Sequence, residues 1–293
     1  MEEPLKFFDN LRETGEMIKF QHTVFALPFA MIALVSAPAE GWPPLRVWLL
    51  VLLAMVAART AAMAFNRLID HKVDALNPRT ADRSLPGGRL SRGFVGAITI
   101  VASAIFVLAA ALLNSLCLLL ALPTLVVLLG YSLAKRFTAA AHLWLGAALG
   151  IAPIGAWIAA SGRLDPTPVV LGFSVMVWVA GFDIIYSLQD EAFDRSAGLH
   201  SIPVALGSVR ALATARIFHS LSLVGFSAFA IMSGGGPLRW SAVIAAAAML
   251  GWQHTLVAPD DLSRVNAAFF TANGILAVVM GVLFITARAL GGG

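Results

Sequence analysis

Residues 45–74 of the chain read LRVWLLVLLAMVAARTAAMAFNRLIDHKVD. The first part, residues 45–68, is mostly apolar and long enough for a helix to cross about 30 Å of hydrocarbon, at a rise of about 1.5 Å per residue. The last part carries an amide and two carboxylates at Asn66, Asp70 and Asp74. Ionisable groups at such a place in a membrane segment are candidates for function. The stretch therefore predicts a membrane helix that leads into a site.

The composition of the whole chain agrees with a membrane protein. Of its 293 residues 59% are hydrophobic and 12% are charged, and the mean hydropathy is +0.85. A soluble chain carries about 25% charged residues, because hydrated side chains must cover its surface. The composition excludes a soluble enzyme and a disordered tail, and the single cysteine, Cys117, excludes a disulfide-held module and a cysteine metal cluster.

Apolar stretches of about 20 residues recur along the whole chain, separated by turn-forming Gly, Pro, Asn and Asp. We expect one all-α domain over residues 1–293, a polytopic membrane protein with about nine transmembrane helices. The predicted spans lie at 21–39, 45–68, 93–113, 116–134, 141–161, 167–188, 209–233, 237–257 and 265–287.

The distribution of Lys and Arg predicts the orientation. With nine spans the two termini face opposite sides, and fourteen Lys and Arg residues fall on the N-terminal side against four on the other. Positive residues gather in cytoplasmic loops, so we expect a multi-pass protein of a bacterial inner membrane with a cytoplasmic N-terminus. Because membrane orientation accounts for the basic residues, the net charge of +4 does not indicate a nucleic-acid partner, and the expected surrounding is the lipid bilayer. The acidic first ten residues predict no cleaved leader.

Two long polar loops, at about 69–92 and 189–208, fall on the predicted cytoplasmic side. Each begins with carboxylates at helical spacing. Asn66, Asp70 and Asp74 stand at i, i+4 and i+8, and the second set, Asp183, Tyr186, Asp190 and Asp194, stands at i, i+3, i+7 and i+11. Successive helical turns bring such positions onto one face, so two acidic stripes are predicted.

Stripes of this kind indicate a bound cation, because like charges at i, i+4 repel each other and an ionised Asp near the membrane is costly. Hard oxygen ligands without cysteine suit Mg²⁺, which commonly bridges carboxylates to substrate phosphates. The loops also supply side chains that can donate hydrogen bonds to phosphate. The first carries Arg79 and Arg83 among Thr, Ser and turn-forming residues, and the second adds Arg195. The sequence thus predicts a site for Mg²⁺ and a phosphorylated substrate.

These motifs resemble the UbiA superfamily of intramembrane prenyltransferases. The first signature is Asn66-x-x-x-Asp70-x-x-x-Asp74 followed by Asn77-Pro78-Arg79-Thr80-Ala81-Asp82-Arg83-Ser84-Leu85-Pro86-Gly87-Gly88. The second is Asp190-x-x-x-Asp194-Arg195 with Gly198-Leu199-His200-Ser201-Ile202-Pro203. KFQHTVFALP at 19–28 and YSLAKRFT at 131–138 are similar to the 4-hydroxybenzoate polyprenyltransferase branch. In many members an Asp follows the Asn, where this chain has Arg67.

The resemblance implies helices around a central cavity that opens to lipid, with two Mg²⁺ ions holding a prenyl diphosphate between the aspartate motifs. It implies transfer of a polyprenyl group to an aromatic acceptor, 4-hydroxybenzoate above all, in quinone biosynthesis. A dihydroxynaphthoate of a menaquinone route, haem, a chlorophyll-type pigment and a phospholipid precursor remain as alternative acceptors. No obligate protein partner is evident.

The residues expected to act can be grouped by role. The metal ligands are Asn66, Asp70, Asp74, Asp190 and Asp194. The catalytic set adds Asp183 and two tyrosines near span ends, Tyr131 and Tyr186, whose alternative role is to anchor the chain at the interface. The candidates for binding substrate are Asn66, Arg59, Lys19, His22, Arg79, Arg83, Lys135, Arg136 and Arg195.

Arg59 lies seven residues before Asn66, on nearly the same helical face and about 10 Å deeper in the membrane. An intramembrane charge is by default a functional candidate, so we expect Arg59 to anchor a carboxylate of the acceptor. The alternatives are a structural ion pair and a side chain that extends to the membrane surface. Lys19 and His22 lie about one turn apart on the first predicted helix and could reach the diphosphate or the acceptor.

Two other protein classes compete with the enzyme. A cation-coupled transporter also uses intramembrane carboxylates, but near the midplane of the bilayer rather than at one face. A purely structural subunit leaves the two acidic stripes unexplained.

Overall fold

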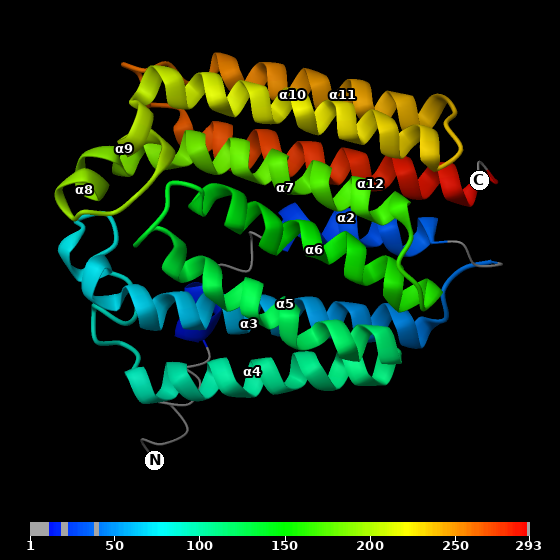
Figure 1. Cartoon of the computed structure of the whole chain (residues 1–293), viewed down its shortest axis with the longest axis horizontal. Helices are drawn as coiled ribbons and strands as arrows, with labels where there is room; N and C mark the ends of the chain where they lie inside the picture. The colour runs from blue at the N-terminus through cyan, green and yellow to red at the C-terminus, as the bar shows by residue number, and fades with distance from the viewer. Residues whose placement is uncertain (1–11, 19–22, 38–40, 292–293) are drawn as a thin grey trace.

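The computed structural model describes residues 12–18, 23–37 and 41–291, and within these the chain forms helices and no strand beyond one isolated bridge. The all-α prediction is confirmed. The long helices lie side by side along one axis (Figure 1). They are α2 (Thr23–Ser36), α3 (Leu45–Leu76), α4 (Arg92–Leu113), α5 (Ser115–Ala134), α6 (Ala141–Ser161), α7 (Pro166–Ser187), α10 (Ser208–Met232), α11 (Pro237–Thr255) and α12 (Asn273–Ala289).

Each of the nine predicted spans corresponds to one of these helices, but the count of about nine membrane helices is not matched in full. Seven helical stretches in the described part of the chain are long and apolar enough to cross a membrane. Helix α2 has only 14 described residues, and α11 is not among the seven because polar side chains such as Arg239 and Gln253 lower its hydropathy.

Short helical elements connect the long helices near one end of the bundle. The turn η2 (Leu188–Asp190) and helix α8 (Glu191–Ser196) follow α7, and α9 (Ile202–Leu206) precedes α10. A π-helical segment, η3 (Ala267–Ala272), runs directly into α12. The predicted loops are therefore more structured than expected, because α3 continues to Leu76 and the region 189–208 contains two helices.

The bundle has two different ends (Figure 1). The connection between α3 and α4 and the helices α8 and α9 gather at one end, which we call the loop end. At the far end the C-terminal part of α12 meets the start of the described chain after α2, where Arg288 Nη2 donates to the carbonyl of Gly41 at 3.2 Å. The two long loops thus lie on one side, as the sequence predicted.

Large apolar side chains cover the outside of the bundle, which fits a surrounding of lipid. Leu45, Ile100, Leu119 and Val224, for example, are exposed by 68–73%. Inside, aromatic rings fill the core: Trp178 packs on Phe29 at 5.1 Å between ring centroids. The indole of Trp178 donates to Asn273 Oδ1 at 3.0 Å, which satisfies its one polar atom.

Helices α6 and α7 approach closely because glycines face each other across their interface. A Cβ atom placed on Gly150 would lie 2.4 Å from the carbonyl oxygen of Gly172, and one on Gly146 would lie 2.1 Å from the carbonyl oxygen of Met176. The obstructing atoms are backbone, which cannot rotate away. Small residues are what lets membrane helices pack so closely.

We predict that Gly150→Ala destabilises the protein by about 1–3 kcal/mol, because the added methyl group must push α6 and α7 apart. Gly155→Ala on the same helix is the control, since a Cβ atom at Gly155 meets nothing within 4 Å. Thermal unfolding of both variants in detergent measures the effect. Equal unfolding temperatures would contradict the close approach at Gly150.

Candidate active site

The first acidic stripe lies on the last turns of α3. This helix continues without interruption to Leu76, so Asn66, Asp70 and Asp74 keep the predicted helical spacing. The side-chain amide of Asn66 donates to Asp70 Oδ2 at 2.8 Å. Asp74 accepts from Arg83 Nη1 at 2.7 and 2.8 Å, one distance to each carboxylate oxygen. The stripe therefore faces the basic loop that follows it in sequence.

The second acidic stripe is not one uninterrupted α-helix. Helix α7 ends at Ser187, and the 3₁₀ turn η2 separates it from α8. Each residue of a 3₁₀ turn advances by a different angle from a residue of an α-helix, so the predicted spacing does not carry unchanged from α7 into α8. Asp183, Asp190 and Asp194 contact three different partners, which are His142, Arg79 and Lys135.

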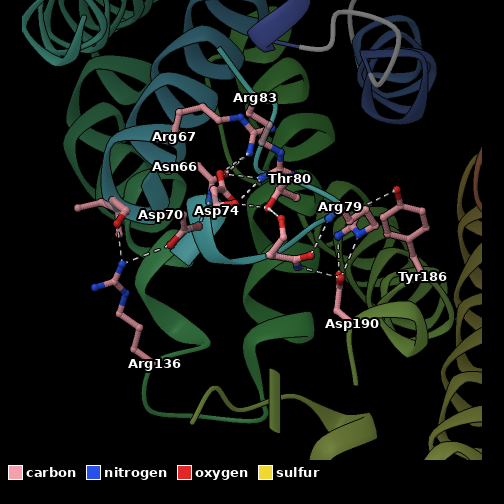
Figure 2. A network of polar contacts seen from close by, with 12 residues as sticks. Asn66, Arg67, Asp70, Asp74, Arg79, Thr80, Arg83, Arg136, Tyr186 and Asp190 are labelled. Carbon is pink, nitrogen blue, oxygen red and sulfur yellow. Dashed lines mark hydrogen bonds and ion pairs between the residues drawn. The ribbon is translucent and has the colours of Figure 1, made fainter. Parts of the chain in front are cut away.

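The loop after α3 joins the two motifs (Figure 2). Arg79 donates to Asp190 through Nε at 3.0 Å and through Nη2 at 2.5 Å, a two-pronged pair. Asn77 supports it, because its side-chain oxygen Oδ1 accepts from the backbone N–H of Arg79 and its side-chain amide donates to Asp190 at 3.4 Å. Thr80 is buried and donates to the backbone carbonyl of Asp74. The loop thereby holds Asp190 beside the end of α3.

The end of α5 contributes two further cations. Lys135 Nζ lies 3.1 Å from Asp194 Oδ2, and Arg136 Nη2 lies 3.3 Å from Asp70 Oδ1 and 2.7 Å from the carbonyl of Ile69. Burial lowers the pKa of Lys135, but Asp194 and Asp183 outweigh it, so the net shift is upward and the ammonium group stays charged.

A segment distant in sequence holds the loop in place. Glu13, in the helical segment 12–18, accepts from the Ser84 hydroxyl at 2.8 Å and from Arg89 Nε at 3.0 Å. The hydrogen bond from Ser84, and then Arg89, hold the pKa of Glu13 below its ordinary value. Beneath this pair Met17 packs in a small apolar cluster with Leu85. The loop that carries Arg79 and Arg83 is therefore held both by the motif aspartates and by Glu13.

An elongated cavity of about 390 Å³ runs from this network into the bundle. Side chains of α2 to α7 and of η3 line it, and most are apolar. Its polar lining includes Asn66 and Asp183, which also belong to the acidic motifs. The predicted central cavity is therefore present and connected to the site at the loop end.

Both tyrosines and Arg59 line this cavity, as expected of residues that meet substrate. Tyr186 connects the cavity to the polar network: its hydroxyl accepts from Arg79 Nη1 at 3.4 Å, and the guanidinium carbon lies 5.6 Å from the ring centroid. The Tyr186 ring also packs on Phe269, with centroids 4.1 Å apart. The Tyr131 hydroxyl lies 3.8 Å from the sulfur of Met63.

Asp183 is held by a histidine, His142, that was not among the predicted site residues. His142 is fully buried, and its Nδ1 lies 2.7 Å from Asp183 Oδ2. The backbone N–H of Ile202 donates to His142 Nε2 at 3.2 Å, so the proton is on Nδ1 and is donated to Asp183. His142 thus links α6, α7 and the start of α9. No spacing in the sequence joins positions 142 and 183.

Arg67 is the second residue whose place the sequence did not predict. Its guanidinium is buried, 3.2 Å from Asn66 Oδ1 and 3.8 Å from Asp74 Oδ2. A charged residue inside a predicted span was the available signal. Arg195, in contrast, is largely exposed and pairs with Glu191 of its own helix. Lys19 and His22 lie outside the described residues.

The donor set at the loop end fits Mg²⁺. Asp70, Asp74 and Asp190 supply carboxylate oxygens and Asn66 an amide oxygen, which are the hard ligands this ion prefers. Within the described residues, no group of three His, Cys, Asp or Glu side chains could hold a metal ion by itself. Oxygens of a substrate would therefore have to complete the coordination, as is usual for Mg²⁺ at phosphate sites.

Known proteins of similar sequence share this site-bearing region. The model of the UbiA prenyltransferase family matches residues 26–275. A 4-hydroxybenzoate octaprenyltransferase of Vibrio parahaemolyticus is 28% identical over 279 residues, which cover 93% of each chain. One of Nitrosomonas eutropha is 27% identical over 249 residues, which cover 85% of this chain and 87% of the relative.

Solved structures agree. The apo structure of a UbiA homolog from Aeropyrum pernix superposes with a TM-score of 0.83 and 34% identity, covering 91% of this chain and 98% of the other. A UbiA homolog from Archaeoglobus fulgidus, bound to GPP and Mg²⁺, gives a TM-score of 0.76 at 18% identity over 94% of this chain and 99% of the other. This second likeness concerns the fold. By sequence and by structure, the chain belongs to the UbiA prenyltransferase family and is a membrane-embedded prenyltransferase.

Proposed function

We propose that the protein transfers a polyprenyl group from a prenyl diphosphate to an aromatic acceptor, 4-hydroxybenzoate, in quinone biosynthesis. One observation carries this proposal: a network of carboxylates and guanidinium groups stands at the end of an apolar cavity that also contains Arg59. A molecule with a charged diphosphate head and an apolar chain matches this division. The names of the relatives from Vibrio and Nitrosomonas support the acceptor.

The diphosphate would bind at the loop end. Arg79, Arg83, Lys135 and Arg136 are basic, partly exposed and within 3.3 Å of the motif carboxylates, so phosphate oxygens that enter here meet several cations. Arginine suits phosphate because its guanidinium donates two parallel hydrogen bonds. Arg195 remains a weaker candidate, since its partner in the structure is Glu191.

Asp70, Asp74, Asp190 and Asp194 would hold Mg²⁺, assisted by Asn66. When bound, Mg²⁺ neutralises the negative charge that develops on the departing diphosphate. Two ions, as the family resemblance implies, are part of this proposal.

The transfer itself would take place in the cavity. The allylic C–O bond breaks, a ring carbon of the acceptor forms the new C–C bond, and the ring loses a proton. Apolar side chains around the cavity keep water from the allylic cation, and the faces of Tyr131 and Tyr186 lie where they can stabilise it by up to about 2 kcal/mol. Asp183 lines the cavity and is oriented by His142, so it is the carboxylate that would accept the proton lost by the ring.

The acceptor would bind with its carboxylate on Arg59. This side chain lines the same cavity and comes from α3, seven residues before Asn66. An arginine in an apolar cavity strongly favours an anionic partner, because a charge-assisted hydrogen bond offsets part of its desolvation. A dihydroxynaphthoate bearing a carboxylate would satisfy the same requirement.

The reaction can be tested on the purified protein in detergent with Mg²⁺, geranyl diphosphate, and 4-hydroxybenzoate or a 1,4-dihydroxynaphthoate. We expect a prenylated product by mass spectrometry that disappears with a chelator. Asp70→Asn and Asp190→Asn should lower turnover at least about a hundredfold, since each removes a carboxylate ligand of the Mg²⁺ that neutralises the diphosphate. Asp82→Asn is the control, because the side chain of Asp82 is exposed and its ion pair is with Arg89 of the same loop. No product with any acceptor or donor length would contradict the proposal.

Arg59→Gln tests the acceptor site. We predict that the KM for 4-hydroxybenzoate rises roughly 10- to 100-fold, the equivalent of a charged hydrogen bond, while the KM for geranyl diphosphate is unchanged. Phenol, which lacks the carboxylate, is the matched control substrate, and its KM should be the same with wild type and with the variant. A loss of the same size with phenol would assign Arg59 a structural role.

The orientation in the membrane can be tested by cysteine labelling in a Cys117→Ala background. Ala197→Cys places a thiol at the exposed loop end, and Leu164→Cys places one at the far end. We expect an impermeant maleimide to label Leu164→Cys in intact bacteria and Ala197→Cys only after permeabilisation, because the basic loop end faces the cytoplasm. The opposite pattern would reverse the orientation.

A further inference from the structure

The four motif aspartates all have a basic partner in the structure. Their shortest contacts are Asp70 with Arg136 at 3.3 Å, Asp74 with Arg83 at 2.7 Å, Asp190 with Arg79 at 2.5 Å, and Asp194 with Lys135 at 3.1 Å. Arg67 adds a second cation 3.8 Å from Asp74. The carboxylate charge at the loop end is therefore already neutralised by the protein itself.

Within the four shortest pairs the acids are more buried than their partners. The side chains of Asp74 and Asp190 are 9% and 11% exposed, whereas those of Arg83 and Arg79 are 25% and 36% exposed. The aspartates sit at the ends of packed helical elements, while the two arginines belong to the loop between α3 and α4. The arginines are thus the partners with room to move.

The arginines use the oxygens that a metal ion would need. Arg79 contacts both carboxylate oxygens of Asp190, and Arg83 contacts both of Asp74. A divalent cation at the same oxygens would meet a guanidinium charge at hydrogen-bond distance. Binding of the cation alone must therefore break these pairs without replacing them, which leaves partly buried charges unpaired at a cost.

A diphosphate changes this balance, because its oxygens offer the displaced guanidinium groups new partners of equal charge and suitable geometry. The cation then takes the carboxylates and the arginines take the phosphates, so no charge loses a partner. Each ligand prepares the site for the other, which is positive thermodynamic coupling.

We propose that Arg79 and Arg83 act as internal counterions: they occupy the metal-binding oxygens of Asp190 and Asp74 in the free enzyme and pass to the diphosphate when the donor binds, so that cation and donor bind jointly. The inference rests on the proposed function. It adds that these two arginines oppose binding of the cation alone, whereas a merely supportive basic residue would not.

The test measures metal affinity without turnover. Mn²⁺ is titrated into the purified full-length protein in detergent without donor, and free Mn²⁺ is counted by electron paramagnetic resonance. We expect weak binding by wild type and binding about tenfold tighter by Arg83→Gln and by Arg79→Gln, a change within the usual range of coupling between two sites. The affinity of the same variants for geranyl thiolodiphosphate at saturating Mg²⁺ should fall.

Two controls separate the inference from a general effect of charge. Arg92→Gln removes one positive charge from an exposed position at the start of α4, in the same end of the molecule, and should leave Mn²⁺ affinity unchanged. Arg83→Lys keeps the charge beside Asp74 and should stay close to wild type. Should Arg83→Gln fail to fold, Arg79→Gln addresses the same question at Asp190.

Equal or weaker Mn²⁺ binding by both glutamine variants would overturn the inference, as would tight binding by wild type without donor. Either result leaves the proposed function standing, provided that wild type still forms a chelator-sensitive product. Absence of that product in wild type is the separate result that contradicts the proposed function.

Discussion

The pairing of partly buried aspartates with loop arginines is the interaction on which the site depends. Lipid surrounds the bundle, and unpaired carboxylates at its end would be costly to keep ionised. Arg79 and Arg83 neutralise Asp190 and Asp74, and in doing so they tie the loop after α3 to both motif-bearing helices. The same contacts that pair these carboxylates with cations therefore also bring the two halves of the site together.

This arrangement places opposite chemistry at the two ends of one cavity. The loop end presents charged groups that suit a diphosphate, and the interior presents apolar walls with a few polar side chains such as Arg59 and Asp183. Tyr186 stands between them, in contact with Arg79 on one side and with Phe269 on the other. Family membership, the cavity and the charge network all agree with a prenyltransferase. A transporter or a purely structural subunit would not explain why the charge network stands at the end of an apolar cavity.

Local sequence was sufficient for the parts of the site that lie on one regular helix. Asn66, Asp70 and Asp74 share a face because α3 runs unbroken to Leu76, and helical periodicity is a local property. The same holds for the spans, because hydrocarbon thickness sets their length. The second motif was harder to predict. The turn η2 interrupts it, and nothing in the residues 188–190 marks that change of helical type.

The sequence by itself determined the membrane class, the nine helical segments, the family resemblance and the residue types at the site, because composition, periodicity and short motifs encode them. Only the tertiary structure decided which charges meet. His142 orients Asp183 across 41 positions, Arg79 reaches Asp190 across 111, and Glu13 holds Ser84 across 71. Such contacts depend on how helices pack, as at Gly150 and Gly172, and packing joins residues whose separation in sequence carries no signal of their contact.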